Sequence, residues 1–206
     1  MNKSPIILFG NGEVPTHPIS LKRIKSANTI ICLDGGADKL IDIGYQPDYI
    51  LGDLDSLALN PDDYGCEFVS LNDQSKNDLE KCLEWCLDND IKKVSLLGFS
   101  GLRDDHSAAA LLSMKTFSDR IGISMITNFS MIKCINGKSK FNVSQGQVIS
   151  IIASNSYTKI RTNGLKHRLN NEVLFSPSNG ISNIALVDSV EIESDDWVWV
   201  FLNHLK

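Results

Sequence analysis

Two aspartates separated by one residue are the side chains best suited to chemistry in this sequence. Asp53 and Asp55 lie in the run Gly52-Asp53-Leu54-Asp55-Ser56. In extended backbone, residues i and i+2 point the same way, so both carboxylates face a common space. Carboxylates this close repel each other unless a cation lies between them, and the hard cation Mg²⁺ prefers oxygen ligands. The alternative is a turn in which these side chains accept hydrogen bonds from backbone N–H groups.

Two further acidic positions can join this pair. Asp34 precedes two glycines, where backbone can approach a phosphate or ribose and a helix can begin, although Asp34 could equally be a plain helix N-cap. Asn77 and Asp78 begin an amphipathic stretch, in which Asn77 fits an N-cap and Asp78 a favourable first-turn anion. The nearby Asp73 favours a site role for Asp78.

A basic side chain follows in the run from Gly98 to His106. Arg103 lies in a glycine-bearing loop and suits a phosphate clamp, because its guanidinium group binds phosphate through two parallel hydrogen bonds. We expect Asp104 or Asp105 to be the N-cap of the helix that follows. His106 is more often structural than a general base at such a position.

Over the first 128 residues, predicted strands alternate with predicted helices, and these elements must position the polar clusters. Buried strands are expected at residues 5–10, 29–33, 49–51, 93–98 and 121–127, and helices at 20–26, 37–43, 77–90 and 106–117. This alternation is typical of an α/β domain. Ligands bind at the carboxyl ends of the strands in open α/β sheets, so the polar clusters should converge at one edge.

The pattern changes from about residue 129 to short β-rich runs without a convincing helix. Asn136-Gly137 predicts a β-hairpin, and further runs lie at residues 148–154, 157–162, 183–187, 189–194 and 197–202. We therefore expect an α/β domain over residues 1–128 and an all-β domain over residues 129–206.

Composition excludes several classes of protein. The 206 residues carry a net charge of −5, so no general attraction to nucleic acid or to an anionic membrane is expected. No apolar run approaches the ~20 residues of a membrane span, no signal peptide is recognisable, and no P-loop motif occurs. Five cysteines without CxxC spacing argue against a disulfide framework or zinc knuckle, which indicates a reducing cytoplasm.

Taken in order, five segments resemble the thiamine pyrophosphokinase family. They read CLDGGADKL (32–40), PDYILGDLDS (47–56), NDQSKNDLEKCLEW (72–85), LLGFSGLRDDH (96–106) and TNGLKHRLNN (162–171), the last followed by SNGISN (178–183). The resemblance implies a Rossmann-like α/β nucleotide-binding catalytic domain over residues 1–128 and a C-terminal β-sandwich domain that binds thiamine over residues 129–206. It also implies a homodimer with active sites between subunits, and transfer of pyrophosphate from ATP to thiamine with release of AMP.

The family's functional positions carry over to this chain motif by motif. The resemblance implies Mg²⁺ held by Asp34, Asp53, Asp55 and Asp78; catalysis by Asp53, Asp55, Asp78, Arg103 and Asp105; ATP contacts from Asp34, Gly35, Gln74, Asn77 and Arg103; and thiamine contacts from Ser182 and Asn183.

One more thiamine contact is suggested by chemistry. Trp197 and Trp199 share a strand face, and Trp199 could stack on the cationic thiazolium ring. Packing in the core or at a dimer interface is the stronger alternative for such a strand.

The sequence departs from the family pattern at three places. Asn77 stands where the family usually has Thr, Leu102 interrupts a glycine-rich run that often ends Gly-Gly-Arg, and His167 and Arg168 replace an aromatic residue and proline. Two other functions compete with thiamine pyrophosphorylation: transfer to another alcohol such as a pterin, and sensing of ATP or thiamine without turnover. A purely structural protein would have no use for these loops.

Overall fold

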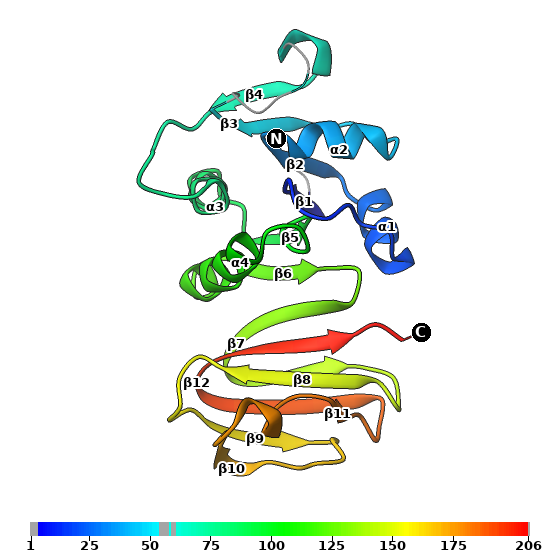
Figure 1. The fold of residues 1–206 in the computed structure, drawn as a ribbon, viewed down its shortest axis with the longest axis vertical. Helices are drawn as coiled ribbons and strands as arrows, with labels where there is room; N and C mark the ends of the chain where they lie inside the picture. Colours follow the sequence, from blue (N-terminus) through cyan, green and yellow to red (C-terminus); the bar gives the residue numbers. More distant parts are fainter. Residues whose placement is uncertain (1–3, 54–57, 59–60, 206) are drawn as a thin grey trace. The chain divides into compact units, whose positions relative to one another are not determined.

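The computed structural model describes residues 4–53, 58 and 61–205, and Asp55 lies outside them. The chain divides into two compact units, residues 1–128 and 129–206. In the first unit, strands and helices alternate, and in the second the chain folds into strands (Figure 1). The fold is therefore a mixed α/β fold.

The first unit is built on a parallel sheet of six described strands. The strands are β1 (Ile6–Phe9), β2 (Thr29–Leu33), β3 (Tyr49–Gly52), β4 (Glu67–Ser70), β5 (Lys93–Leu97) and β6 (Gly122–Ile126). Their order in the sheet is β6-β5-β1-β2-β3-β4, with every pair parallel. The buried strands are continuous apolar runs, as expected for a sheet covered on both faces. Strand β4 was not predicted from the sequence, because its only large apolar residues are Phe68 and Val69.

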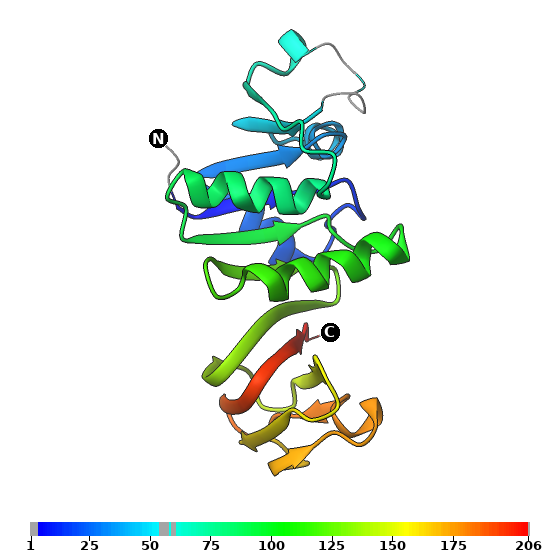
Figure 2. The ribbon, with the colours of Figure 1, turned by 90° about the vertical axis from the view of Figure 1, so that its left-hand side faces the viewer.

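Helices cover both faces of this sheet. They are α1 (Pro18–Lys25), α2 (Gly36–Asp42), α3 (Asp78–Asp88) and α4 (Asp104–Phe117), with a 3-10 turn η1 at Pro61–Tyr64. Helices α1 and α2 lie on one face, and α3 and α4 lie on the other (Figure 2). The chain winds outward from β1 to β4 and then returns to β5 on the other side of β1. The strand order therefore reverses between β1 and β5, where open α/β sheets bind ligands.

The helix starts correct two sequence-based expectations. The N-cap of α4 is Arg103, and Asp104 and Asp105 both lie in the first turn, where they stabilise the helix dipole. The expectation that one of these aspartates is the N-cap was wrong. The N-cap of α2 is Gly35, so Asp34, which lies one residue earlier, is not the N-cap residue of that helix.

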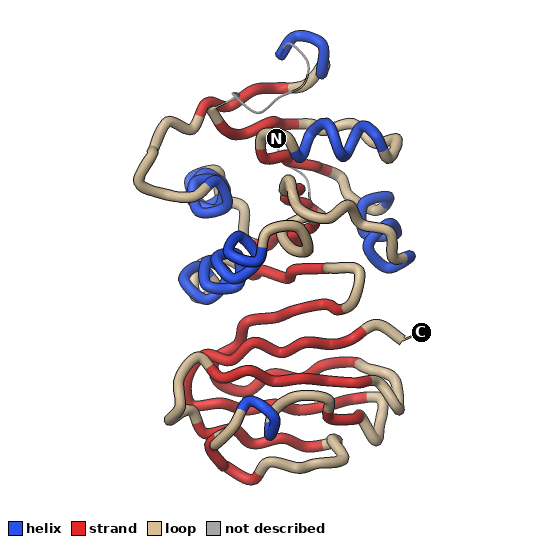
Figure 3. The backbone as a smooth tube through the Cα atoms, in the orientation of Figure 1, coloured by secondary structure: helices blue, strands red, loops and turns tan. Residues whose placement is uncertain are grey.

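The second unit consists of strands with one short 3-10 turn in its described part (Figure 3). It contains β7 (Ser130–Asn142), β8 (Val148–Ala153), β9 (Lys159–Asn163), β10 (Asn170–Val173), η2 (Pro177–Asn179), β11 (Asn183–Ile184) and β12 (Ser189–Asn203). Strand β12 runs antiparallel to β7 along almost its whole length. Its first half also pairs with β9 and its second half with β8.

The predicted hairpin at Asn136-Gly137 was wrong, because β7 continues through both residues as one strand. Gly137 has φ +85 and pairs with Ser194, where β12 shifts register before Val198. The glycine thus accommodates a bulge opposite it and not a chain reversal. The predicted strands at 189–194 and 197–202 are likewise the two halves of β12.

Candidate active site

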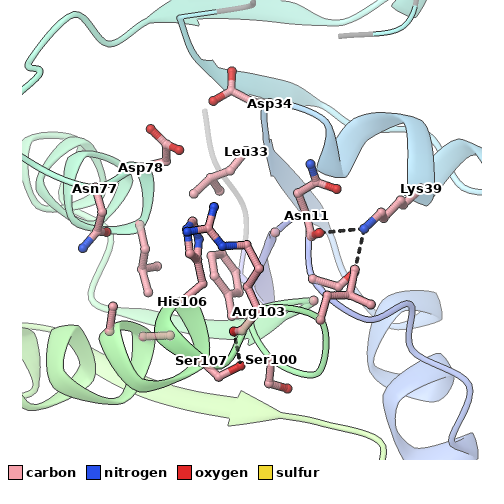
Figure 4. Close-up of a pocket in the computed structure, with 18 of the residues that line it drawn as sticks. Asn11, Leu33, Asp34, Lys39, Asn77, Asp78, Ser100, Arg103, His106 and Ser107 are labelled. Atoms are coloured by element: carbon pink, nitrogen blue, oxygen red, sulfur yellow. Dashed lines mark hydrogen bonds between the residues drawn. The ribbon is translucent and has the colours of Figure 1, made fainter. Parts of the chain in front are cut away.

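A pocket of about 630 Å³ lies in the first unit, where the loops after β1, β2, β3 and β5 meet the starts of α3 and α4. It brings together five residues that the sequence analysis assigned to a site: Asp34, Asp53, Asn77, Asp78 and Arg103. Figure 4 shows the Asp34 and Asp78 carboxylates and the Arg103 guanidinium entering the pocket from different elements. Gly35, Gln74 and Asp105 do not line this pocket, and Asp55 lies outside the described residues.

Asp34 is held at the end of β2 by unusual backbone. It has φ +41 and is 8% exposed, and its N–H donates to the carbonyl oxygen of Leu51 at 3.2 Å. A Cβ atom on Gly52 would overlap the Asp34 carboxylate. Glycine is therefore required at position 52 so that Asp34 can pass close to the end of β3. This contact joins the acidic loops that follow β2 and β3.

Asp78 begins α3 and forms an ion pair within the same helix. Asn77 is the N-cap of α3, and its side-chain oxygen accepts a hydrogen bond from the Glu80 N–H at 3.0 Å. One turn later, Lys81 Nζ lies 2.7 Å from Asp78 Oδ1. Burial lowers the pKa of Lys81, but the hydrogen bond and charge of Asp78, with the charges of Asp53 and Asp34, leave it raised overall.

Arg103 is oriented by a partner in its own helix turn. Its Nε donates to Asp105 Oδ1 at 3.1 Å, and its Nη2 donates to Asp105 Oδ2 at 2.6 Å. This hydrogen bond from Arg103 is the largest cause that lowers the pKa of Asp105 to about 2. A carboxylate with so low a pKa accepts a proton poorly near neutral pH. Asp105 thus orients Arg103 and is a weak candidate for the general base.

The loops after β1 and β5 are joined by backbone contacts. Gly10 N–H donates to the Leu97 carbonyl at 2.9 Å, and Gly12 N–H donates to the Gly98 carbonyl at 2.6 Å. Lys39 Nζ donates to the carbonyl oxygens of Asn11 and Gly12 at 2.6 and 2.8 Å, as dashed in Figure 4. These contacts hold the pocket floor where the strand order reverses.

Three pocket-region residues were missed or undervalued from the sequence. Lys39 and His106 line the pocket, and Lys81 is paired with Asp78 behind it. The signal for Lys81 was present, since a lysine three residues after an aspartate on a helix forms an i,i+3 ion pair. Its burial could not be read from the sequence, because lysine is ordinarily exposed.

The pocket carboxylates have the chemistry of ligands for a divalent cation. Within the described parts of the chain, no three His, Cys, Asp or Glu side chains are grouped so that they could hold a metal ion. Asp34, Asp53 and Asp78 nevertheless present oxygen donors to one pocket. Mg²⁺ is usually held by one or two carboxylates, with water and substrate phosphates as its other ligands. The donor set therefore fits such an ion in its chemistry.

A second pocket of about 450 Å³ lies in the second unit and is lined by Ser182, Asn183, His167 and Arg168, among others. Asn183 Oδ1 accepts from His167 N–H at 2.9 Å, and Asn183 Nδ2 donates to the His167 carbonyl at 2.6 Å. The Asn183 amide therefore positions the loop that carries His167 and Arg168. Trp199 is 8% exposed and does not line this pocket. The structure thus places it with the packed residues of the second unit.

Comparison with known proteins covers both units. Residues 21–125 match the family model "Thiamin pyrophosphokinase, catalytic domain", and residues 135–199 match "Thiamin pyrophosphokinase, vitamin B1 binding domain". Thiamin pyrophosphokinase 1 of Caenorhabditis elegans is 26% identical over an alignment of 180 residues that covers 74% of this chain and 72% of that protein. Thiamine pyrophosphokinase 2 of Arabidopsis thaliana is 26% identical over an alignment of 203 residues that covers 82% of this chain and 76% of that protein.

Solved structures share the fold. Thiamine pyrophosphokinase from Bacillus subtilis superposes with a TM-score of 0.80 at 19% identity, covering 97% of this chain and 99% of that chain. Thiamin pyrophosphokinase from Candida albicans superposes with a TM-score of 0.79 at 18% identity, covering 96% of this chain and 89% of that chain. The sequence-based resemblance is therefore confirmed. With two family models matched in chain order, one over each unit, this chain belongs to the thiamin pyrophosphokinase family.

Proposed function

We propose that this protein transfers the pyrophosphoryl group of ATP to the hydroxyl group of thiamine, which gives thiamine diphosphate and AMP. The observation that carries the proposal is the pocket lined by Asp34, Asp53, Asp78 and Arg103, side chains from separate loops within the unit matched by the catalytic model. Pure recognition of ATP has little need for three carboxylates in one pocket, because like charges repel an anionic ligand. This argues against a sensing module without turnover.

The chemistry needs alignment and charge neutralisation more than covalent help from the protein. The thiamine hydroxyl oxygen forms a bond to the β-phosphorus of ATP, and the bond from that phosphorus to the oxygen bridging to the α-phosphate breaks. AMP leaves with the bridging oxygen, and the hydroxyl proton is released. Arg103, oriented by Asp105, binds the phosphates of the transferred group and stabilises their charge.

The proposed metal is Mg²⁺, held by Asp34, Asp53 and Asp78, with Asp55 as a further ligand that the sequence predicts outside the described residues. When bound, the ion neutralises charge on the phosphate oxygens. Asn77 caps α3 and so fixes the start of the helix that presents Asp78. The roles of Gly35 and Gln74 toward ATP stay predictions, because neither lines the pocket.

The second unit is proposed to bind thiamine through its pocket. Ser182 is exposed there, with its N–H donating to Ser150 Oγ at 3.0 Å, while Asn183 acts through the His167 loop. Stacking of Trp199 on the thiazolium ring stays a prediction, because Trp199 is 8% exposed and does not line this pocket. We further infer a Rossmann-like first unit from its parallel strand order, and a β-sandwich in the second from the way β12 changes partners along its length.

Two expectations about the whole protein stay predictions: a homodimer with active sites at the subunit interface, and a cytoplasmic location. Among the residues that the structure describes, no helix is both long and apolar enough to cross a membrane.

Incubation with ATP, Mg²⁺ and thiamine, followed by phosphorus NMR and chromatography of the thiamine products, tests the proposal. We expect thiamine diphosphate and AMP in equal amounts. A pterin alcohol tested in parallel separates the nearest rival function. Formation of ADP and thiamine monophosphate, or binding of both ligands without turnover, would contradict the proposed reaction.

A further inference from the structure

Lys81 is an unusual lysine for its degree of burial. Only 6% of it is exposed, and it is the one lysine or arginine in the buried class within the described residues. Burial of an ammonium group is costly unless the charge is paired and hydrogen-bonded. A lysine that served only to fill space would be replaced at lower cost by an apolar residue. The burial of this charged group therefore indicates an electrostatic role for Lys81.

The contacts of Lys81 point toward the acidic side of the pocket. Its Nζ lies 2.7 Å from Asp78 Oδ1 and donates to the Leu71 carbonyl oxygen at 3.4 Å. The Asp78 side chain is 52% exposed, so the ammonium lies behind a carboxylate that faces the pocket. Lys81 also interacts electrostatically with Asp53 and Asp34. One buried cation thus acts on the three carboxylates that line the pocket.

Other cations near this pocket are engaged elsewhere. Arg103 is paired with Asp105 at 2.6 Å, and Lys39 donates to backbone carbonyl oxygens after β1. Three carboxylates that share one pocket repel each other through a medium that screens less than water. Among the residues that the structure describes, Lys81 is the buried cation placed to offset that repulsion.

We propose that Lys81 is a positioning residue of the active site, the resident counter-charge that orients Asp78 and keeps Asp34, Asp53 and Asp78 together before substrate and metal bind. The inference rests on the proposed function in one respect, since it takes these carboxylates to meet a divalent cation. It extends that function by assigning a task to a residue that does not line the pocket.

The test is the thermal stability of four proteins with and without saturating Mg²⁺: wild type, Lys81→Met, Asp78→Asn and the double variant. Without Mg²⁺, Lys81→Met should lower Tm by about 5–10 °C, since the half-exposed Asp78 carboxylate loses its buried partner at 2.7 Å and is left unpaired beside Asp34 and Asp53. Adding Asp78→Asn to Lys81→Met should raise Tm again, because it removes the carboxylate left without its cation. Mg²⁺ should raise the Tm of Lys81→Met more than that of wild type, because a more negative pocket binds it more tightly.

Lys76→Met is the matched control. Lys76 lies in the same segment and pairs with Glu84 at 2.8 Å, but its side chain is 37% exposed. Exposed pairs contribute little, so its Tm should change by less than about 2 °C and should not depend on Mg²⁺. Additive losses from Lys81→Met and Asp78→Asn, or a loss from Lys81→Met that Mg²⁺ does not reduce, would overturn the proposal.

The double variant decides the question even if Lys81→Met does not fold, because the proposal requires it to be more stable than Lys81→Met alone. None of these measurements uses turnover. A wild-type protein that makes no thiamine diphosphate would therefore refute the proposed function. The Tm measurements would still decide whether Lys81 is the counter-charge of the three carboxylates.

Discussion

Asp53 follows the last residue of β3 and is exposed in the pocket, so its side chain contributes little to the packed core. We expect Asp53→Ala to fold with a Tm within about 2 °C of wild type, as is usual for an exposed position. Its rate of thiamine diphosphate formation should fall by about 100-fold or more, because a proposed ligand for the phosphate-bound cation is lost. Circular dichroism melting and a product assay check the two parts. A variant with near-normal turnover would remove Asp53 from the metal assignment.

Asp105 could act in either of two ways, by orienting Arg103 or by accepting a proton as the general base, and the two roles predict different kinetics. Its pKa is lowered to about 2, chiefly by the hydrogen bond from Arg103. A depressed carboxylate pKa means that the ion pair stabilises the fold above the unfolded pKa of about 4, and that this contribution is lost as pH falls toward 2. The pair therefore stays intact throughout the range in which enzymes are normally assayed.

We accordingly expect Asp105→Asn to raise the KM for ATP several-fold, because Arg103 loses its orienting partner, while the shape of the pH–rate profile between pH 5 and 9 is kept. Steady-state kinetics across pH provide the measurement. Disappearance of the acid limb in Asp105→Asn would instead identify Asp105 as the base.

Residue types and spacing predicted that several acidic side chains share the pocket, but not what each does in it. Asp34, Asp53 and Asp78 were grouped correctly, because each follows an element that ends at the same edge of the sheet. Asp105 and Lys81 were not understood from the sequence. Their roles depend on which neighbour each side chain reaches, and that is set by rotamers and packing.

At the scale of elements, the loops after β1 and β5 depend on glycine at one close approach. Gly98 has φ +72, and a Cβ atom there would lie 2.5 Å from the Gly10 carbonyl oxygen. Gly98→Ala should therefore lower Tm by about 5–10 °C, since it combines backbone strain with a clash, and should reduce activity by displacing the pocket floor.

Gly44→Ala is the control that measures the backbone strain without the clash. Gly44 has a similar φ of +84 in the same unit, with nothing within 4 Å of an added Cβ. Gly44→Ala should lower the free energy of unfolding by only about 1 kcal/mol, which is roughly 2–4 °C in Tm, and should leave turnover normal. Equal effects of the two substitutions on Tm and activity would show that the contact between the loops is unimportant.

Helices and strands with a clear period of apolar residues were predicted well. Strands whose geometry depends on pairing with a segment distant in the sequence were not. The apolar stripe from Leu79 to Cys86 gave α3, because a period of 3.6 residues is a local property. Asn136-Gly137 has the composition of a hairpin turn, yet β7 runs through it. The pairing of β7 with β12 across about 60 residues of intervening chain decides that geometry, and no local pattern reports it.

At the scale of the whole molecule, two units carry separate pockets, and the family resemblance implies that active sites form between subunits of a homodimer. That implication can be tested by mixing two inactive variants. Asp53→Ala removes a proposed ligand in the first unit, and Ser182→Trp fills the pocket of the second, where Ser182 is exposed. Each homodimer should be nearly inactive while retaining its fold.

If one active site draws on the first unit of one subunit and the second unit of its partner, subunit exchange restores function. Random reassembly of the two variants makes about half of the dimers mixed, and each mixed dimer holds one site with neither substitution. About one quarter of wild-type activity should then return after co-refolding. A mixture that stays as inactive as its components would mean that each chain builds its own site, because every site would then carry one of the two substitutions.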